Sequence, residues 1–274
     1  MSQLGRSLAV GALLCAVVTA GQVAPPATAA ASAPQVYLVQ GIPGQTLDLY
    51  VDGNLVLTGV RPGGVAGPIG LDLTRGTHDI VLTPERAPLG SAIVTELGMR
   101  VPAEPSLSLV THLTGAGGSA VTAYVNDLTR TGAGKARLVV RHAADAPAAE
   151  VQADQTTLFT ELAGSDEQVV DVDAGRTPIQ VRVATPGGGS VLSPGRLPLT
   201  EGTSTIVHLV GSARDRSLSL VVQTIDGLGT TPRRSGLSAL SSRSLSLSWY
   251  ALGFAGMILF VGGFGLLRLR LSTR

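Results

Sequence analysis

Histidine and acidic side chains gather in one short stretch, "RHAADAPAAEV", at residues 141–151. It contains His142, Asp145 and Glu150 within eleven residues. A histidine beside two carboxylates can act as a general base together with an acid, or can supply ligands to a metal ion. The proline at 147 and the small residues between the acids are equally typical of a turn between two strands. The stretch is therefore either a chemical site or a turn.

The alternation of apolar residues around this stretch favours the turn. Successive side chains of a strand point to opposite faces, and His142 shares the inward parity of Val140. Pro147 fixes the backbone before the next strand, and Asp145 can accept backbone hydrogen bonds within the turn. Glu150 has the outward parity of that next strand, so it and His142 are directed to different faces. We therefore predict a turn with a structural histidine, and we assign no catalytic, cofactor-binding or metal-binding residue.

Two further histidines, His112 and His208, stand in similar contexts, "LVTHLTG" and "TIVHLVG". The similarity suggests equivalent places in two related units. A zinc site needs three or four convergent ligands, and neither histidine has a cysteine or an acidic residue close to it in the sequence. We expect both histidines to be structural, bonded to the backbone or facing solvent.

The elements that carry these residues are strands. Between residues 35 and 227 the apolar residues recur with a period of two, as they do in half-buried strands. In "YVDGNLVL", Asp52 and Gly53 separate two apolar runs, and both residues accept the positive φ that a tight hairpin turn requires. Several short strands follow, punctuated by glycine and proline. The pattern predicts an all-β protein built from β-sandwiches.

The strand pattern occurs twice. "VYLVQGIPGQTLDLYVDG" from Val36 aligns with "LVVRHAADAPAAEVQADQ" from Leu138 at an offset of 102 residues, whereas the two histidine contexts align at an offset of 96. Trimming of loops accounts for such a difference. We predict two tandem modules, residues 35–129 and 136–227, joined by the linker "TGAGK".

Part of the sequence resembles a known family. "HAADAPAAEV" resembles the "HASPDAPAVDV" signature of the domain-of-unknown-function 4397 family, and "DLYVDGNLVL" resembles the hairpin that follows it. Ala144 replaces the usual proline and Glu150 the usual aspartate, while the first module lacks the His-Ala start. The resemblance extends over most of both modules and implies two tandem copies, the first of them degenerate. It implies secreted or surface-attached bacterial Ig-like modules and carries no catalytic residue over to this chain.

The N-terminus has the order of parts of a signal peptide. Arg6 precedes the apolar run 8–20, which is followed by two prolines and the small residues around Ala29. We predict a signal peptide over residues 1–30. Cys15, the only cysteine, lies inside it, so the mature protein would have no disulfide. Lys135 is the only lysine among twenty basic residues, a bias that suggests an actinobacterial source.

The C-terminus has the composition of a membrane anchor. Residues 249–267 carry no charge and would span about 28 Å as a helix at ~1.5 Å per residue, close to the thickness of a bilayer core. Trp249 stands at one end and arginines follow the other, which places the tail 268–274 in the cytoplasm. Residues 228–248 are rich in serine and predict a flexible stalk. The chain is thus expected in the cell membrane as a single-pass protein with its ectodomain outside.

The composition of the chain excludes one class of partner but does not identify the ligand. Charged residues make up 14% of the chain and the net charge is +1, which indicates no nucleic-acid-binding face. The leading hypothesis is a non-enzymatic cell-surface protein whose modules bind an envelope polysaccharide or a surface protein. The second is a structural or assembly partner of another membrane or envelope protein. The third is an enzyme that uses His142, Asp145 and Glu150. Oligomeric state stays open.

Overall fold

A computed structural model describes residues 34–71, 73, 76–115, 117–185 and 188–231. The predicted signal peptide (1–30), membrane helix (249–267) and tail (268–274) lie outside the described residues, as does most of the predicted stalk. Within the described residues, no helix combines the length and apolar character that crossing a membrane requires. The regular elements of the described chain are strands apart from one 3-10 turn, η1 (Leu89–Ser91), which confirms the all-β prediction.

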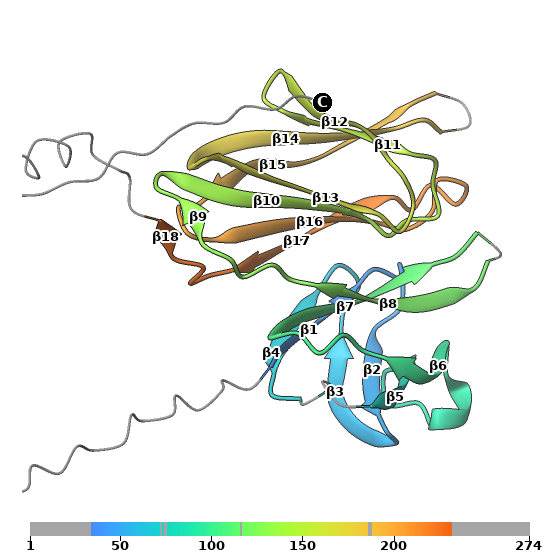
Figure 1. Cartoon of the computed structure of the whole chain (residues 1–274). Coiled ribbons are helices and arrows are strands. Elements are labelled where there is room, and N and C mark those ends of the chain that lie inside the picture. Colours follow the sequence, from blue (N-terminus) through green and yellow to red (C-terminus); the bar gives the residue numbers. More distant parts are fainter. Residues whose placement is uncertain (1–33, 72, 74–75, 116, 186–187, 232–274) are drawn as a thin grey trace, which may run out of the picture.

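The first unit consists of two four-stranded sheets (Figure 1). One sheet has the order β4 (Val65–Ile69), β1 (Gln35–Gln40), β7 (Ser106–Leu113), β8 (Ser119–Val125). The other has the order β3 (Asn54–Val60), β2 (Leu47–Val51), β5 (Thr77–Pro84), β6 (Val94–Arg100). All pairings are antiparallel except that of β1 with β7, which is parallel. The two sheets enclose one core, and we call this unit the first sandwich.

The second unit repeats this topology strand for strand. One sheet has the order β13 (Glu167–Asp173), β10 (Lys135–His142), β16 (Ser204–Val210), β17 (Ser219–Ile225). The other has the order β12 (Thr156–Leu162), β11 (Ala149–Ala153), β14 (Gly175–Val183), β15 (Ser190–Leu199). β10 and β16 form the parallel pair. These two sheets enclose a core of their own, and we call this unit the second sandwich.

The predicted alternation produces the two cores. In β2, Leu47, Leu49 and Val51 are buried in the first core, as expected from their common parity. The hairpin predicted at Asp52 and Gly53 joins β2 to β3, with φ of 50° and 78° at these two residues. A left-handed residue at each turn position lets the strands keep their right-handed twist across the turn. These local predictions from the sequence are confirmed.

One prediction for the strands is wrong: several are buried on both faces rather than one. Every residue of β16 is buried, and so are five of the six residues of β1. The reason is that the sheet containing β1 packs against the sheet containing β10, so the two sandwiches are stacked (Figure 1). The shared apolar layer comprises Tyr37, Val39, Val110 and Tyr124 from the first sandwich and Val139, Ala143, Ile206, Val210, Val221, Ile225 and Leu228 from the second.

The chain on either side of the second sandwich is also more ordered than its sequence suggests. Thr230–Thr231, within the predicted stalk, form β18, which pairs in parallel with β9 (Thr131–Gly132) in the predicted linker. Leu228 explains this difference, because its side chain is buried between the sandwiches and its N–H donates to the carbonyl of Gly202. A buried leucine holds the chain against the sandwich for a few residues beyond β17.

Candidate functional site

The signature stretch forms a turn that is fixed at both ends. The ring of His142 is fully buried, and its Nε2 lies 2.9 Å from the carbonyl oxygen of Pro147. Asp145 donates its N–H to the carbonyl of Gly211, and its Oδ2 accepts a hydrogen bond of 3.2 Å from the hydroxyl of Ser212. These contacts tie the turn between β10 and β11 to the loop between β16 and β17.

The structure does not bring His142, Asp145 and Glu150 together as an acid–base set. Glu150 lies on the outer face of its sheet, between residues of β11 that are buried in the core. Its carboxylate accepts a hydrogen bond from the Gln152 side chain on the same face. Each of the three candidate residues therefore makes its own separate local contacts.

The first sandwich holds the equivalent turn with a glutamine. Gln40 aligns with His142 and Gln45 with Pro147 at the offset of 102 residues. The Gln40 amide Nε2 donates to the carbonyl of Gln45 over 2.6 Å, and the Gln40 Oε1 accepts from the N–H of Ile42 over 2.6 Å. The same position thus closes the same turn in both sandwiches, by different side chains. The sequence alignment pairs Gln40 with His142 but does not show that each makes the equivalent hydrogen bond.

His112 and His208 are not equivalent, contrary to the sequence prediction. Ser106 lies opposite Gln35 in the first sandwich, and Ser204 lies opposite Arg137 in the second. Because Gln35 and Arg137 differ by 102, the serines fix the offset between β7 and β16 at 98 residues rather than 96. Two valine positions are therefore the structural counterparts of the two histidines. The histidine that the two segments share therefore does not mark the structural register.

The two histidines also differ in their surroundings. The ring of His112 is half-buried and contacts the Thr122 hydroxyl at 2.9 Å and the Leu113 carbonyl at 3.1 Å. His208 is fully buried, with its Nε2 at 3.2 Å from Oε1 of Gln223. Burial, and then the positive charge of Arg141, lower the pKa of His208 to about 3. His208 is therefore neutral at physiological pH.

A crevice of about 250 Å³ lies where the signature turn meets the first sandwich. His112, Thr114 and Gly115 line it from the first sandwich, and the signature turn with Ser165 lines it from the second. The crevice brings His112 and His142 to one place. Both ring nitrogens of His112 contact neighbouring oxygens, whereas His142 is engaged through Nε2 alone and its buried Nδ1 has no hydrogen-bond partner among the described residues. No group of three or more His, Cys, Asp or Glu side chains suited to a metal ion occurs in the part of the chain that the structure describes.

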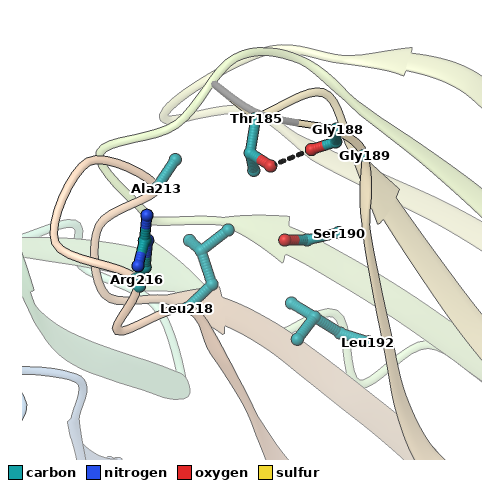
Figure 2. Close-up of a pocket in the computed structure, with 8 residues that line it drawn as sticks. All are labelled: Thr185, Gly188, Gly189, Ser190, Leu192, Ala213, Arg216 and Leu218. Carbon is teal, nitrogen blue, oxygen red and sulfur yellow. Dashed lines mark hydrogen bonds between the residues drawn. The ribbon is translucent and has the colours of Figure 1, made fainter.

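A larger cavity, of about 460 Å³, lies at the end of the second sandwich (Figure 2). Its walls are the end of the β14–β15 hairpin and the loop between β16 and β17. The lining residues are Thr185, Gly188, Gly189, Ser190 and Leu192 from the hairpin, and Ala213, Arg216 and Leu218 from the loop. This cavity could not be predicted from the sequence, because its two walls are more than twenty residues apart and carry no recognisable motif.

The fold and these sites define an all-β protein of two stacked sandwiches that repeat one topology. Residues 34–152 match the family described as "Domain of unknown function (DUF4397)", which confirms the resemblance seen in the sequence. The match covers the first sandwich and ends in β11, directly after the signature stretch. It therefore includes the module that the sequence marks as degenerate and does not extend over the rest of the second.

Comparisons with individual proteins add little to the family match. No curated protein matches the chain. Among solved structures, pneumolysin is similar at 11% identity and a TM-score of 0.25, over 56% of this chain and 39% of that chain. CBMbc, of family CBM26, from Eubacterium rectale Amy13K in complex with maltoheptaose, is similar at 11% identity and a TM-score of 0.22, over 72% of this chain and 97% of that chain. Scores this low support no argument about fold or ligand.

Proposed function

We propose that this chain is a non-enzymatic, single-pass protein of the cell surface, whose Ig-like modules bind a polymer or a protein of the envelope. The apolar C-terminal run, the arginines after it and the signal-like N-terminus support this placement. In this proposed placement, the two sandwiches lie outside the membrane and the C-terminus lies in the cytoplasm.

The stacking of the sandwiches limits which surfaces can meet a ligand. The sheets that contain β1 and β10 cover each other, so their outer faces are occupied. The loops at the ends of the sandwiches and the outer faces of the other two sheets stay accessible. The observation that carries the proposal is the cavity of Figure 2, because it lies between loops at the end of a rigid sandwich, where such folds commonly hold their binding sites.

A second candidate function, assembly with another membrane or envelope protein, is favoured by a difference between the duplicated sheets. On the outer face of the first sandwich, Tyr50 pairs with Leu55 on one side and Val81 on the other. Leu55 is 51% exposed. The equivalent row in the second sandwich is Gln152, with Thr157 and Gln180 beside it. An apolar row at positions that are polar in the duplicate is suited to contact with a protein partner.

Sedimentation tests the leading proposal. The full chain, purified in a mild detergent, is mixed with isolated envelopes of the source organism and centrifuged, and the bound fraction is measured against concentration. Saturable binding that survives protease treatment of the envelopes supports a polymer ligand. Binding that the protease abolishes supports a protein ligand. A folded chain that binds neither preparation contradicts the proposal and favours assembly within the membrane.

A further inference from the structure

We infer that the cavity of Figure 2 binds an anionic group of an envelope polymer, a phosphate or a carboxylate, and that Arg216 recognises its charge. The inference rests on the proposed function and adds the class of ligand to it. It follows from the charge of the lining, the Ser190 hydroxyl on the opposite wall and the backbone conformation of Arg216.

The lining carries positive charge only. Arg216 is the sole ionisable residue among the side chains that line the described cavity. The residues of the hairpin that line the cavity, Thr185, Gly188–Ser190 and Leu192, include no ionisable side chain. Asp215, the neighbouring acid, does not line the cavity, and no ion pair joins it to Arg216 in the described residues. The guanidinium is thus available to an anion from outside.

Hydrogen-bonding groups face Arg216 across the cavity. Figure 2 shows the hydroxyl of Ser190 directed toward the loop that carries Arg216 and Leu218. Within the described residues this hydroxyl has no hydrogen-bond partner, whereas the hydroxyl of Thr185 donates to the carbonyl of Gly188 and closes the hairpin. A guanidinium fork opposite a free hydroxyl can bind two oxygens of a phosphate or a carboxylate. The apolar side chains of Leu192 and Leu218 also line the cavity.

The size of the cavity fits part of a polymer. Its volume of about 460 Å³ lies within the range of about 300–1,000 Å³ that is usual for small-molecule sites. It lies between two loops and is open to solvent, so a charged unit can enter while the polymer on either side continues along the surface.

Arg216 occupies a backbone position that favours glycine. Its φ is 52°, in the left-handed region, where a Cβ is disfavoured. The turn is closed by the N–H of Arg216 on the carbonyl of Ala213 and by the N–H of Ser217 on the carbonyl of Ser212. A residue under such strain at a cavity points to a role for its side chain. The left-handed conformation also makes Arg216→Gly a useful variant, because it removes the charge while relaxing the backbone.

Binding of the full chain to defined polymers tests the inference. The chain is purified in a mild detergent, and its dissociation constants are measured for poly(glycerol phosphate), polygalacturonate and neutral dextran. We expect saturable binding of at least one polyanion and none of dextran. Arg216→Gly should weaken that binding at least tenfold. The matched control, Arg214→Gly, removes the same charge from the same turn but outside the cavity lining, and should change binding less than twofold.

The outcomes separate this inference from the proposed function. The phosphate polymer and the carboxylate polymer distinguish the two sources of the anion. Equal binding by wild type and Arg216→Gly, or equal losses in both variants, would overturn the inference. A wild-type chain that sediments with envelopes but binds neither polyanion also overturns it and leaves the proposed function standing. A chain that binds neither envelopes nor polyanions contradicts both. Thermal unfolding shows that each variant is folded, since Arg216→Gly should be at least as stable as wild type.

Discussion

The guanidinium of Arg141, in the second sandwich, lies 4.7 Å from the ring centroid of Tyr124, in the first. The same group donates from Nη2 to the carbonyl of Val125 over 2.9 Å and from Nε to Glu167 over 2.8 Å. Only 1% of Arg141 is exposed. A charged side chain is therefore one of the main packing elements between the sandwiches, held by a cation–π contact and by charge-assisted hydrogen bonds.

Arg141→Met should weaken the junction of the sandwiches while keeping most of the apolar stem. We expect a loss of about 2–3 kcal/mol in the free energy of unfolding, because the cation–π contact and two charge-assisted hydrogen bonds disappear together. Urea unfolding at neutral pH measures it. Arg196→Met, at an exposed position of β15, is the control. A change below about 0.5 kcal/mol, the range of ordinary surface substitutions, would contradict this account of Arg141.

Gly41 is required where the first sandwich approaches the second. A Cβ at this position would lie 2.4 Å from the carbonyl oxygen of Thr111 and 2.7 Å from Cγ1 of Val210. Gly41→Ala should therefore cost about 1–3 kcal/mol, the usual effect of overpacking. Gly90→Ala is the matched control, because a Cβ there meets nothing within 4 Å. Thermal unfolding of the two variants decides the question, and equal melting temperatures would contradict this account of Gly41.

The strands and the hairpin at Asp52 could be predicted from the sequence because their cause is local. Alternation fixes which residues of β2 face the core, and two residues that tolerate positive φ fix the turn. The role of His142 follows in the same way from its parity with Val140. In these segments the local pattern and the tertiary structure require the same thing.

The stacking of the sandwiches could not be predicted, because its polar residues resemble those of a solvated face. Arg137 and Arg141 have the outward parity of β10, yet both are buried. Arg137 reaches Asp127 at 2.8 Å and Asp171 at 3.0 Å. The available signal was in β16, whose run "STIVHLV" is apolar at both parities. Such runs are typical of strands that are covered on both faces.

Replacement of His142 tests whether its role is to close the signature turn. Because Gln40 makes the equivalent contact in the first sandwich, His142→Gln should cost less than about 1 kcal/mol. His142→Leu cannot donate to the carbonyl of Pro147 and should cost at least about 1 kcal/mol, since that hydrogen bond is lost. Urea unfolding separates the two results. Equal destabilisation by both variants would show that the ring has another role.

The apolar row of the first sandwich can be replaced by the polar residues that occupy the equivalent positions of the second sandwich. The triple variant Tyr50→Gln, Leu55→Thr, Val81→Gln introduces the residues that the second sandwich carries at the equivalent positions. All three positions lie on the outer face, so the fold should tolerate the change within about 1 kcal/mol. Crosslinking of the full chain in intact cells then tests the second candidate function. Protein adducts that disappear in the triple variant support assembly through this face, and adducts that persist place the contact elsewhere.

His208 should make the stability of the protein depend on pH. Burial lowers its pKa in the folded protein from the ordinary 6.5 to about 3, so between these values the unfolded chain binds a proton that the folded chain does not. Its contribution to stability is therefore complete above about pH 6.5 and falls by about 1.4 kcal/mol for each unit of pH below that, until about pH 3. His208→Gln keeps a side-chain donor toward Gln223 but cannot take up a proton. Urea unfolding from pH 7 to pH 4 should show a shallower decline for this variant than for wild type, and parallel declines would mean that the folded protein protonates His208 as readily as the unfolded chain does.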